Sequence, residues 1–597
     1  MEIKAKKRSE IPAEYKWKRE DLFATEADWR KELDAISATT DDLASYQGKL
    51  DNAKALLECF EKYFEAGKTM GAIYVYATMQ LHEDANISES QGLADMAQSA
   101  YVKFAAATSF ITPEILSHEN ETIRGFVASE PGLKLYEHYL EALMLGKPHI
   151  LSAEIEAIMA NANEAISGPS NIYNMLASAD LKFGTVVDDK GNTVEITQGR
   201  YSSLMENRDR RVRKDTFETY YKSYWALKNA FATMLNASIK NDIFVARTRK
   251  YDSALDMALA NYNIPRSVYE QLISTVGEYL PVLHRYYALR KKVLGLDELH
   301  LYDLFVPIVD EANTDVSYED AKKKLAEGLA PLGKDYLAAM SKGMESGWVD
   351  VYENEGKESG AYAWGSSKAH PYVLMNYDGK ISDMLTLAHE MGHAMHSYYT
   401  WETQPNVYAS YSIFLAEVAS TVNETILTDY MIKTTTDKNV RTYLLDSYLD
   451  QFNGTLFRQT MFAEFELITH TMVENGEPLT LDGLNKLFRE LNEKYFGPAM
   501  TLDEESDLGW ARIPHFYRAY YVYQYATGYS AAVAFNKRLQ SGDAKALDEY
   551  LGFLKAGSSD YSIEILKKAG VDMSSPTPVR EALTVFEELV GELEKAL

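Results

Sequence analysis

The sequence has almost no cysteine. Cys59 is the single cysteine among 597 residues, so no disulfide bond can form within one chain. Such scarcity is typical of proteins that work in a reducing compartment. Cys59 lies in the amphipathic run LLECFEKYF. That setting predicts a buried structural thiol rather than a nucleophile.

Long apolar runs are also missing. Nowhere do about 18 apolar residues follow one another, which is the length that a transmembrane helix needs. The first residues, MEIKAKKRSEIPAEYKW, are partly basic, but no apolar core follows them. We therefore expect no secretory signal peptide. Together with the cysteine content, this predicts a cytoplasmic protein without a membrane partner.

Positive charge is scarce relative to negative charge. The chain has 61 Lys and Arg against 88 Asp and Glu, a formal net charge of −27. Nucleic acids and anionic membranes are polyanions and would repel such a surface. The charge balance therefore argues against a nucleic-acid partner, and it keeps a large protein soluble.

Helical periodicity dominates what the sequence does contain. Apolar residues recur at spacings of three and four through most of the chain, which predicts a mainly α fold. Strand signals are confined to 181–197, with a hairpin turn in its middle, and to 360–381. A chain this long exceeds one hydrophobic core, so we expect two lobes. We predict a helical N-terminal lobe over 1–195 and a catalytic region over 196–597.

The run His-Glu-Met-Gly-His at 389–393 is the strongest chemical signal. It lies in a predicted helix that opens at Ser382. On a helix, His393 falls about 40° from His389, so both imidazoles share one face, and apolar residues occupy the opposite face. Two histidines at this spacing can bind one Zn²⁺, and Glu390 can take a proton from water that the metal activates.

A catalytic zinc needs a third protein ligand and one open position. His396 shares the face of the histidine pair but lies about 10 Å along the axis from His389, too far to join the same coordination sphere. We interpret it as a residue that supports the site or the fold. The next predicted helix carries Glu417 and Glu424 on one face. One should bind the metal and the other should hold a ligand imidazole, but helical geometry alone does not choose between them.

Several segments together resemble the oligoendopeptidase F group of the thimet-oligopeptidase-like zinc peptidases. They run nearly end to end: YKWKREDLF, YDSALDMALANYNIP, GAYAWGSSKAHPYVLMNYDG, LAHEMGHAMHSYY, FLAEVASTVNE, FRQTMFAEFE and IPHFYRAYYVYQYATG. The resemblance implies that Glu417 is the third ligand of one zinc ion per chain and that Glu424 supports the site. It also implies a prolate, two-lobed zincin-type body with a deep channel, a small β-sheet near the metal, and short unfolded peptides as substrates.

Oxyanion stabilisation needs donors besides the metal, and the tyrosine-rich stretch 510–532 offers them. The resemblance implies a histidine and one or two tyrosines of this stretch as contacts to the substrate carbonyl. His515 is the counterpart of that histidine. The tyrosine spacing of the group does not transfer without a gap, and we predict Tyr523 ahead of Tyr520. Most other tyrosines of the stretch are expected to be packing residues.

Substrate alignment is predicted from the strand signal GAYAWG at 360–365. Extended peptides commonly pair with a strand edge, and glycines permit close backbone approach, so Gly360, Ala361 and Tyr362 are candidate substrate contacts. An ordinary structural strand is the equal alternative. Arg512 is a candidate for binding a peptide carboxylate, with a surface salt bridge as its alternative.

These observations predict a zinc metalloendopeptidase that cleaves internal bonds of short oligopeptides, as a monomer or small homo-oligomer. One alternative is a zinc metallocarboxypeptidase on a similar helical scaffold. Another is a non-catalytic helical peptide-binding protein with a structural metal. Structural zinc sites usually close with four ligands, often cysteines, and no cysteine lies near this site.

Overall fold

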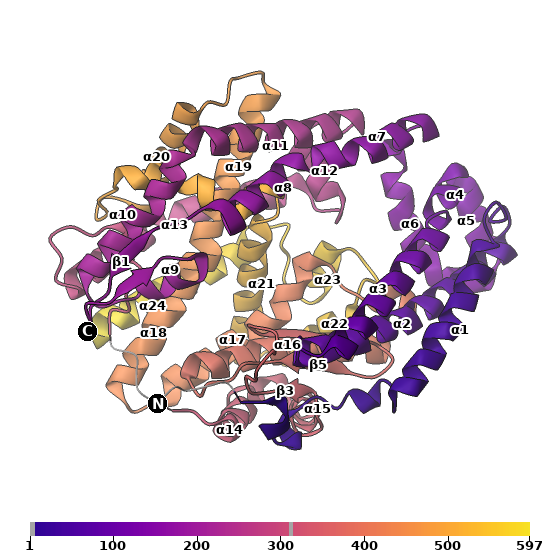
Figure 1. The fold of residues 1–597 in the computed structure, drawn as a ribbon, viewed down its shortest axis with the longest axis horizontal. Helices are drawn as coiled ribbons and strands as arrows, with labels where there is room; N and C mark the ends of the chain where they lie inside the picture. Colours follow the sequence, from indigo (N-terminus) through magenta and orange to yellow (C-terminus); the bar gives the residue numbers. More distant parts are fainter. Residues whose placement is uncertain (1–5, 310–314) are drawn as a thin grey trace. The chain divides into compact units, whose positions relative to one another are not determined.

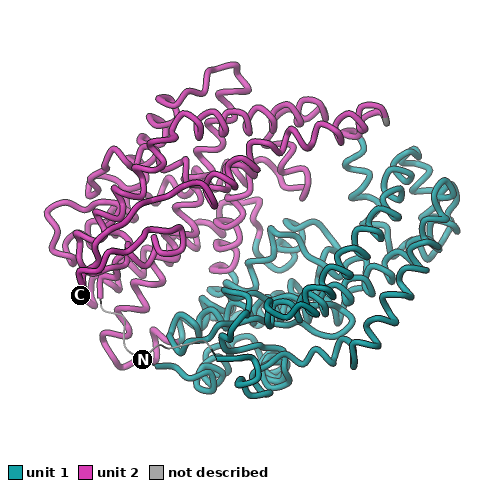
Figure 2. The backbone as a smooth tube through the Cα atoms, in the orientation of Figure 1, with its two compact units in different colours: residues 1–147, 314–430, 535–571 teal, residues 148–313, 431–534, 572–597 magenta. Residues whose placement is uncertain are grey.

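The computed structural model describes residues 6–309 and 315–597, mostly as α-helices (Figure 1). The chain forms two compact units, each assembled from three stretches of sequence (Figure 2). Unit 1 comprises 1–147, 314–430 and 535–571, and unit 2 comprises 148–313, 431–534 and 572–597. The predicted mainly α class is confirmed. The predicted boundary between a helical N-terminal lobe and a catalytic region at 195/196 falls within unit 2, and this division stays a prediction.

Unit 1 contains the histidine pair. Its helices are α1 (Glu26–Ala44), α2 (Ala53–Glu83), α3 (Ser88–Thr108), α4 (Ile111–Ser117), α5 (Asn120–Ser129), α6 (Glu137–Gly146), α14 (Tyr318–Gly328), α15 (Lys334–Glu345), α16 (Ile381–Thr403), α17 (Ile413–Thr434), α22 (Ala546–Ala556) and α23 (Ser562–Lys568). The last residues of α17 extend into unit 2, and α21 (Tyr523–Gln540) likewise runs from unit 2 into unit 1.

The helices α1, α2 and α3 pack against one another around a hydrophobic core. Trp29 of α1 is fully buried there, and its indole N–H donates to the carbonyl of Ile73 at 2.9 Å, which satisfies its polar edge. Both α1 and α2 begin at side-chain caps, Thr25 and Asn52. Cys59 of α2 is a free, buried thiol, as the sequence predicted.

A three-stranded sheet precedes α16 in the chain. Its strands are β3 (Val349–Asp350), β4 (Tyr362–Gly365) and β5 (Pro371–Leu374), in the order β3-β5-β4. Strand β5 is central and fully buried, parallel to β3 and antiparallel to β4. Strand β4 is therefore an edge strand. Both β4 and β5 pack against α16, so the sheet lies beside the helix that carries the histidine pair.

Unit 2 is also helical. Its elements are α7 (Ala153–Ile166), α8 (Gly168–Met175), α9 (Gln198–Met205), α10 (Arg210–Ala226), α11 (Lys228–Thr248), α12 (Ala254–Ala260), α13 (Arg266–Val293), α18 (Lys438–Phe452), a π-helical turn (Asn453–Phe457), α19 (Arg458–Glu474), α20 (Leu481–Phe496), α24 (Thr577–Ala596), and the strands β1 (Thr185–Val187) and β2 (Thr193–Glu195). The antiparallel pair β1–β2 is the predicted hairpin. Asp188 closes its turn by accepting the backbone N–H groups of Lys190 and Asn192 at 2.9 and 2.7 Å.

Candidate metal centre

Helix α16 presents the histidine pair. It begins at Ile381, one residue before the predicted start, and the Asp383 carboxylate accepts the backbone N–H of Lys380 at 2.9 Å. That bond satisfies an amide at the helix entrance. The predicted apolar face is buried: Met384, Leu387, Met391 and Met395 each have no exposed surface. Burial of this face holds the orientation of the helix, and with it the direction of the two imidazoles.

Helix α17 comes unusually close to α16 at Gly392. A Cβ atom on Gly392 would lie 2.5 Å from the Cα of Ser420 and 2.7 Å from the carbonyl oxygen of Ala419. Asn423 joins the helices one turn further on: its side-chain amide donates to the carbonyl of Ala388 at 3.1 Å, and its oxygen accepts from the Tyr336 hydroxyl at 2.9 Å. These contacts align α17 so that its glutamates face α16.

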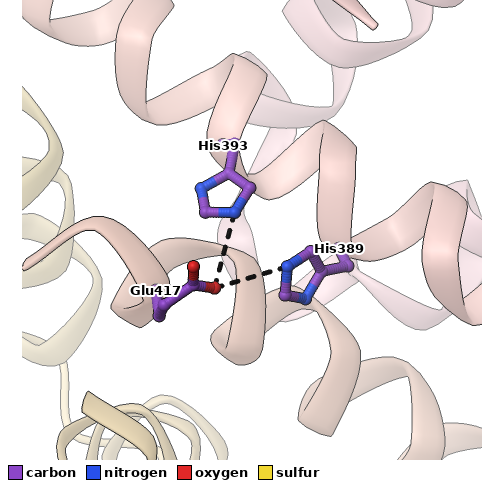
Figure 3. Close-up of side chains that lie close together, drawn as sticks. All are labelled: His389, His393 and Glu417. Carbon is purple, nitrogen blue, oxygen red and sulfur yellow. Dashed lines mark ion pairs between the residues drawn. The ribbon is translucent and has the colours of Figure 1, made fainter. Parts of the chain in front are cut away.

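His389, His393 and Glu417 lie together (Figure 3). The Oε2 atom of Glu417 is 3.4 Å from Nε2 of His389 and 3.5 Å from Nε2 of His393. The three ligand atoms all lie within 4.8 Å of one another. Two imidazole nitrogens and one carboxylate oxygen are the donor set of a catalytic zinc site, so these residues fit the ion that the sequence predicts.

The electrostatics of the cluster match a cation site. Burial by itself lowers the pKa of His389, but hydrogen bonds to Glu417 and Glu424 outweigh it and raise that pKa to about 10. Burial raises the pKa of the Glu417 carboxyl, yet the two imidazoles overcome this effect and bring it well below its ordinary value. The carboxylates thus favour positive charge at His389, and a metal cation can take the place of that proton.

Glu424 lies behind the first histidine. Its Oε2 atom is 3.2 Å from Nδ1 of His389, while Nε2 of the same ring points to Glu417. A carboxylate on Nδ1 fixes the ring tautomer that leaves Nε2 free for a metal. In this geometry Glu417 contacts both imidazoles through Nε2, and Glu424 orients one of them.

Glu390 is mostly buried beside the cluster, with 7% of its surface exposed. Burial raises the pKa of its carboxyl, and the neighbouring His389 and His393 partly oppose this. A glutamate with a raised pKa is a better proton acceptor near neutral pH than an exposed one.

His396 lies among aromatic side chains rather than with the three clustered residues. It is 1% exposed, its ring stacks on Tyr411 at 3.7 Å, and Phe553 lies 4.9 Å from it. Burial, with a smaller contribution from His393, lowers the pKa of His396 to about 3. A neutral imidazole inside an aromatic stack has a packing role in this fold.

The candidate substrate strand begins later than the sequence suggested. Gly360 has φ +80° and Ala361 also precedes the strand, so β4 starts at Tyr362. The left-handed conformation at Gly360 ends the extended backbone there. The hydroxyl of Tyr362 lies 2.7 Å from Nδ1 of His82, which ties the start of the edge strand to α2.

The predicted oxyanion donors belong to unit 2. His515 is half-buried in a 3₁₀ helix (Pro514–Tyr517), and burial, reinforced by Arg518, lowers its pKa. Tyr520 and Tyr523 are 3% and 2% exposed and pack against Tyr269 with ring centroids 5.6 and 5.0 Å away. Burial raises the pKa of both hydroxyls.

A different tyrosine accompanies His515. The hydroxyl of Tyr525 lies 3.3 Å from Nε2 of His515, and the ring of Tyr521 stacks parallel to the imidazole with centroids 5.8 Å apart. Both tyrosines are partly exposed. Sequence reasoning placed Tyr523 and Tyr520 ahead of them from a family spacing that does not transfer without a gap, and the backbone of this stretch is not one continuous helix. Tyr520 has φ +57°, and α21 begins only at Tyr523.

Arg512 ends another 3₁₀ helix of unit 2 (Glu504–Arg512). Its guanidinium lies over the rings of Tyr201 and Tyr220, at 5.0 and 5.6 Å from their centroids. Its Nη1 group donates to the Tyr221 hydroxyl at 3.5 Å. Arg512 is thus enclosed by tyrosines rather than held in a surface salt bridge.

Known proteins match this chain over most of its length. Residues 203–585 match the model of Peptidase family M3, and residues 114–183 match the Oligopeptidase F model. The chain is 46% identical to oligopeptidase PepF of Bacillus subtilis over 99% of this chain and 88% of that protein. It is 40% identical to group B oligopeptidase PepB of Streptococcus agalactiae over 98% of both. The crystal structure of oligoendopeptidase-F from Enterococcus faecium superimposes with a TM-score of 0.74, at 38% identity, over 96% of this chain and 99% of that one.

Proposed function

The chain belongs to peptidase family M3 and is a metalloendopeptidase, and from that premise we propose that one zinc ion held by His389, His393 and Glu417 enables it to hydrolyse internal bonds of short peptides. The observation that carries this proposal is the convergence of these three ligand atoms within 4.8 Å. Zinc, when bound, supplies Lewis acidity that lets water lose a proton near neutral pH and polarises the scissile carbonyl.

Glu390 is the proposed general base. Its buried carboxylate accepts the proton that the attacking water loses, because burial raises its pKa toward the working range. The same carboxyl then returns the proton to the leaving amine, so that the glutamate is unchanged after each turnover. Glu424 holds the Nδ1 proton of His389 throughout and keeps that ring directed at the metal position.

His515 and Tyr525 are the proposed donors to the oxyanion. His515 stays neutral near pH 7 because burial lowers its pKa, and a tyrosine hydroxyl is also a neutral donor. Their contact at 3.3 Å supports a shared role. Tyr523 and Tyr520 remain candidates from the sequence, but their near-complete burial favours Tyr525.

Peptide substrate is proposed to align along β4. The strand forms the edge of its sheet, all four of its residues are partly exposed, and an edge presents backbone groups that an extended peptide can pair with. Gly360 and Ala361 precede that edge and would meet the end of a bound peptide.

The compartment, substrates, oligomeric state and partners are also proposed from the sequence. We infer action in the cytoplasm, on short unfolded peptides, by a monomer or small homo-oligomer, without nucleic-acid or membrane partners. Among the described residues, no helix is long and apolar enough to cross a membrane.

A direct test uses a short, internally quenched peptide blocked at both ends. The zinc-loaded chain should cleave it, a chelator should stop cleavage, and Glu390→Gln should abolish cleavage while zinc content stays at one per chain. The matched control is Glu402→Gln, the same substitution at an exposed position of α16, which should cleave normally. Full zinc binding without any cleavage by the native chain would refute endopeptidase action. Cleavage only of peptides with a free carboxyl end would favour the carboxypeptidase alternative.

A further inference from the structure

Unit 2 contains a cavity of about 440 Å³ whose lining includes none of the proposed metal ligands, Glu390, His515 or Tyr525. It does include Arg512, the residue that the sequence offered for binding a peptide carboxylate. Its wall is largely aromatic, with Tyr201, Phe217, Tyr221, Phe462 and Phe496 all at most 6% exposed. A volume of this size and an apolar lining with few polar groups are typical of a small-molecule site. The polar groups of the lining therefore indicate what it can bind.

Two guanidinium groups line this cavity without a carboxylate partner. Arg458 lies over the rings of Phe462 and Phe496, at 5.1 and 5.2 Å from their centroids, as Arg512 lies over tyrosines. Within the described part of the chain, neither arginine forms an ion pair. Burial lowers the pKa of Arg458, and the charge of Arg512 acts in the same direction, against the opposing effect of nearby tyrosines.

Two buried arginines of the same unit differ from this pair, whose members are partly exposed. Arg213 donates to Asp303 at 2.7 Å, and Arg290 donates to Asp446 at 3.0 Å. That pairing is the usual condition for burying a charge, since an unpaired charge away from water is costly. Stacking on aromatic faces offsets part of this cost. The remaining positive potential at Arg458 and Arg512 favours an anion from outside the chain.

One carboxylate does line the cavity, but it is engaged elsewhere. Oδ1 of Asp450 accepts the Tyr286 hydroxyl at 2.7 Å and lies 3.4 Å from Nη1 of Arg290. It therefore contributes to the Arg290 network, and within the described residues it forms no ion pair with either cavity arginine.

The helix beside the cavity is interrupted at the same place. Between α18 and α19 the chain makes a π-helical turn over Asn453–Phe457, and Asn453 and Gly454 of this turn line the cavity immediately before Arg458. Such turns distort a helix and are frequent at functional sites. A Cβ atom on Gly454 would meet no atom within 4 Å, so open space adjoins this residue.

We propose that this cavity is a second ligand site, which binds the carboxylate of an apolar or aromatic organic acid between Arg458 and Arg512. Guanidinium groups match carboxylates in geometry and charge, and the aromatic walls take the apolar body of the ligand. The carboxylate comes either from a small acid or from the C-terminal end of a peptide. The proposal does not rest on the proposed peptide-bond hydrolysis.

The test is calorimetric titration of the zinc-loaded full-length chain with N-acetyl-L-phenylalanine, repeated after chelation. We expect one molecule per chain with a dissociation constant of about 1 mM or tighter, and the binding should survive removal of the metal. N-acetyl-L-phenylalanine amide, which lacks the charge, should not bind. Acetyl-glycyl-glycyl-phenylalanine with a free carboxylate distinguishes the two sources, because it binds only if a peptide can extend out of the cavity.

Two variants and a control test whether the acid binds in this cavity. Arg458→Gln should weaken binding of the acid by about 30-fold or more, since it removes one partner of a buried charge pair. Gly454→Leu keeps both arginines and fills the open space, and it should weaken binding equally. Arg285→Gln, at an exposed arginine of α13, is the matched control and should bind normally. Thermal melting verifies folding, and Gly454→Leu decides the question if Arg458→Gln does not fold.

Crystals soaked with N-acetyl-4-bromo-L-phenylalanine provide an independent readout, with anomalous bromine signal expected in this cavity. The proposal is overturned if no acid binds, if binding disappears with the metal, or if neither variant weakens it. Binding of inorganic phosphate without binding of the acid would also overturn it, as would bromine found only elsewhere.

Discussion

Gly392 of α16 lies directly against the backbone of Ser420 in α17, where a single added carbon would stand 2.5 Å from the Ser420 Cα. The two helices can approach this closely only because Gly392 has no side chain. Glu417 lies one turn before this contact. The position of this proposed metal ligand therefore depends on Gly392, which has no side chain and is not itself a proposed ligand.

Gly392→Ala should therefore damage the metal centre without altering any ligand. The added methyl group pushes α17 away, because the atoms it meets are backbone and cannot rotate aside. We expect about 1–3 kcal/mol of lost stability from overpacking. Zinc affinity should fall by about tenfold or more as Glu417 retreats, in the range seen when a supporting contact is lost.

Competition with a zinc chelator and thermal melting of the metal-free chain measure the two effects separately. The control is Gly92→Ala, at an exposed helical glycine where a Cβ meets no atom within 4 Å, and it should leave both unchanged or slightly improve stability. Unchanged zinc affinity in Gly392→Ala would show that α17 does not depend on this contact.

Glu424→Gln tests the residue behind His389. The amide can still contact Nδ1, but it lacks the charge that favours a protonated Nδ1 and a free Nε2. We expect zinc to bind about 10–100-fold more weakly while all three proposed ligands remain. Activity at saturating zinc should recover in large part. Loss of activity that excess zinc does not restore would assign Glu424 a direct catalytic role instead.

The sequence predicts the contacts within one helix of this site, but not the contacts between two helices. His389 and His393 are neighbours on one helix, so a period of 3.6 residues places them together before any fold is known. Glu417 and Glu424 also share a face, but which of them meets the imidazoles depends on where α16 and α17 cross. That crossing is set by Gly392 and Asn423, and the sequence alone left both glutamates open.

The tyrosine stretch depends on a backbone turn that the sequence does not predict. Within 510–532 the backbone is not one continuous helix, because it turns left-handed at Tyr520 before α21 begins at Tyr523. The turn buries Tyr520 and Tyr523 and leaves Tyr525 beside His515. A non-glycine residue in that conformation is held by its surroundings, and no local sequence signal marks it.

The backbone of Tyr520 is held by Glu466 of α19. Its N–H donates to Oε1 of Glu466 at 3.0 Å, while Oε2 has no partner, and burial raises the pKa of this carboxyl far above its ordinary value. Burial therefore favours the protonated, uncharged form of this carboxyl. We expect Glu466→Gln, which has the same shape and charge state, to retain near-normal stability and activity.

Glu466→Ala leaves the Tyr520 amide buried without an acceptor, which costs about 1–3 kcal/mol. Because the same segment carries His515, kcat should also fall while zinc content stays at one per chain. Thermal melting, kcat and zinc analysis of the two variants make the comparison. Equal damage from Gln and Ala would mean that the ionised carboxylate is the important form.

His396 predicts how stability changes with acid. Its pKa is lowered from 6.5 to about 3 by burial between Tyr411 and Phe553, so the folded chain keeps this imidazole neutral where the unfolded chain protonates it. The unfolded state then binds more protons, and stability falls as pH drops below 6.5. The loss from this group approaches about 1.4 kcal/mol per pH unit until its folded pKa is reached.

His396→Phe removes the titrating group and keeps an aromatic ring in the stack. Its unfolding free energy should therefore fall less steeply between pH 6.5 and 5 than that of the native chain, with both measured in urea after chelation so that metal loss does not contribute. The two curves should run parallel above about pH 7, where the imidazole is neutral in both states. Parallel curves over the whole range would mean that His396 titrates normally in the folded chain, and that the stack around it admits water or a counter-charge.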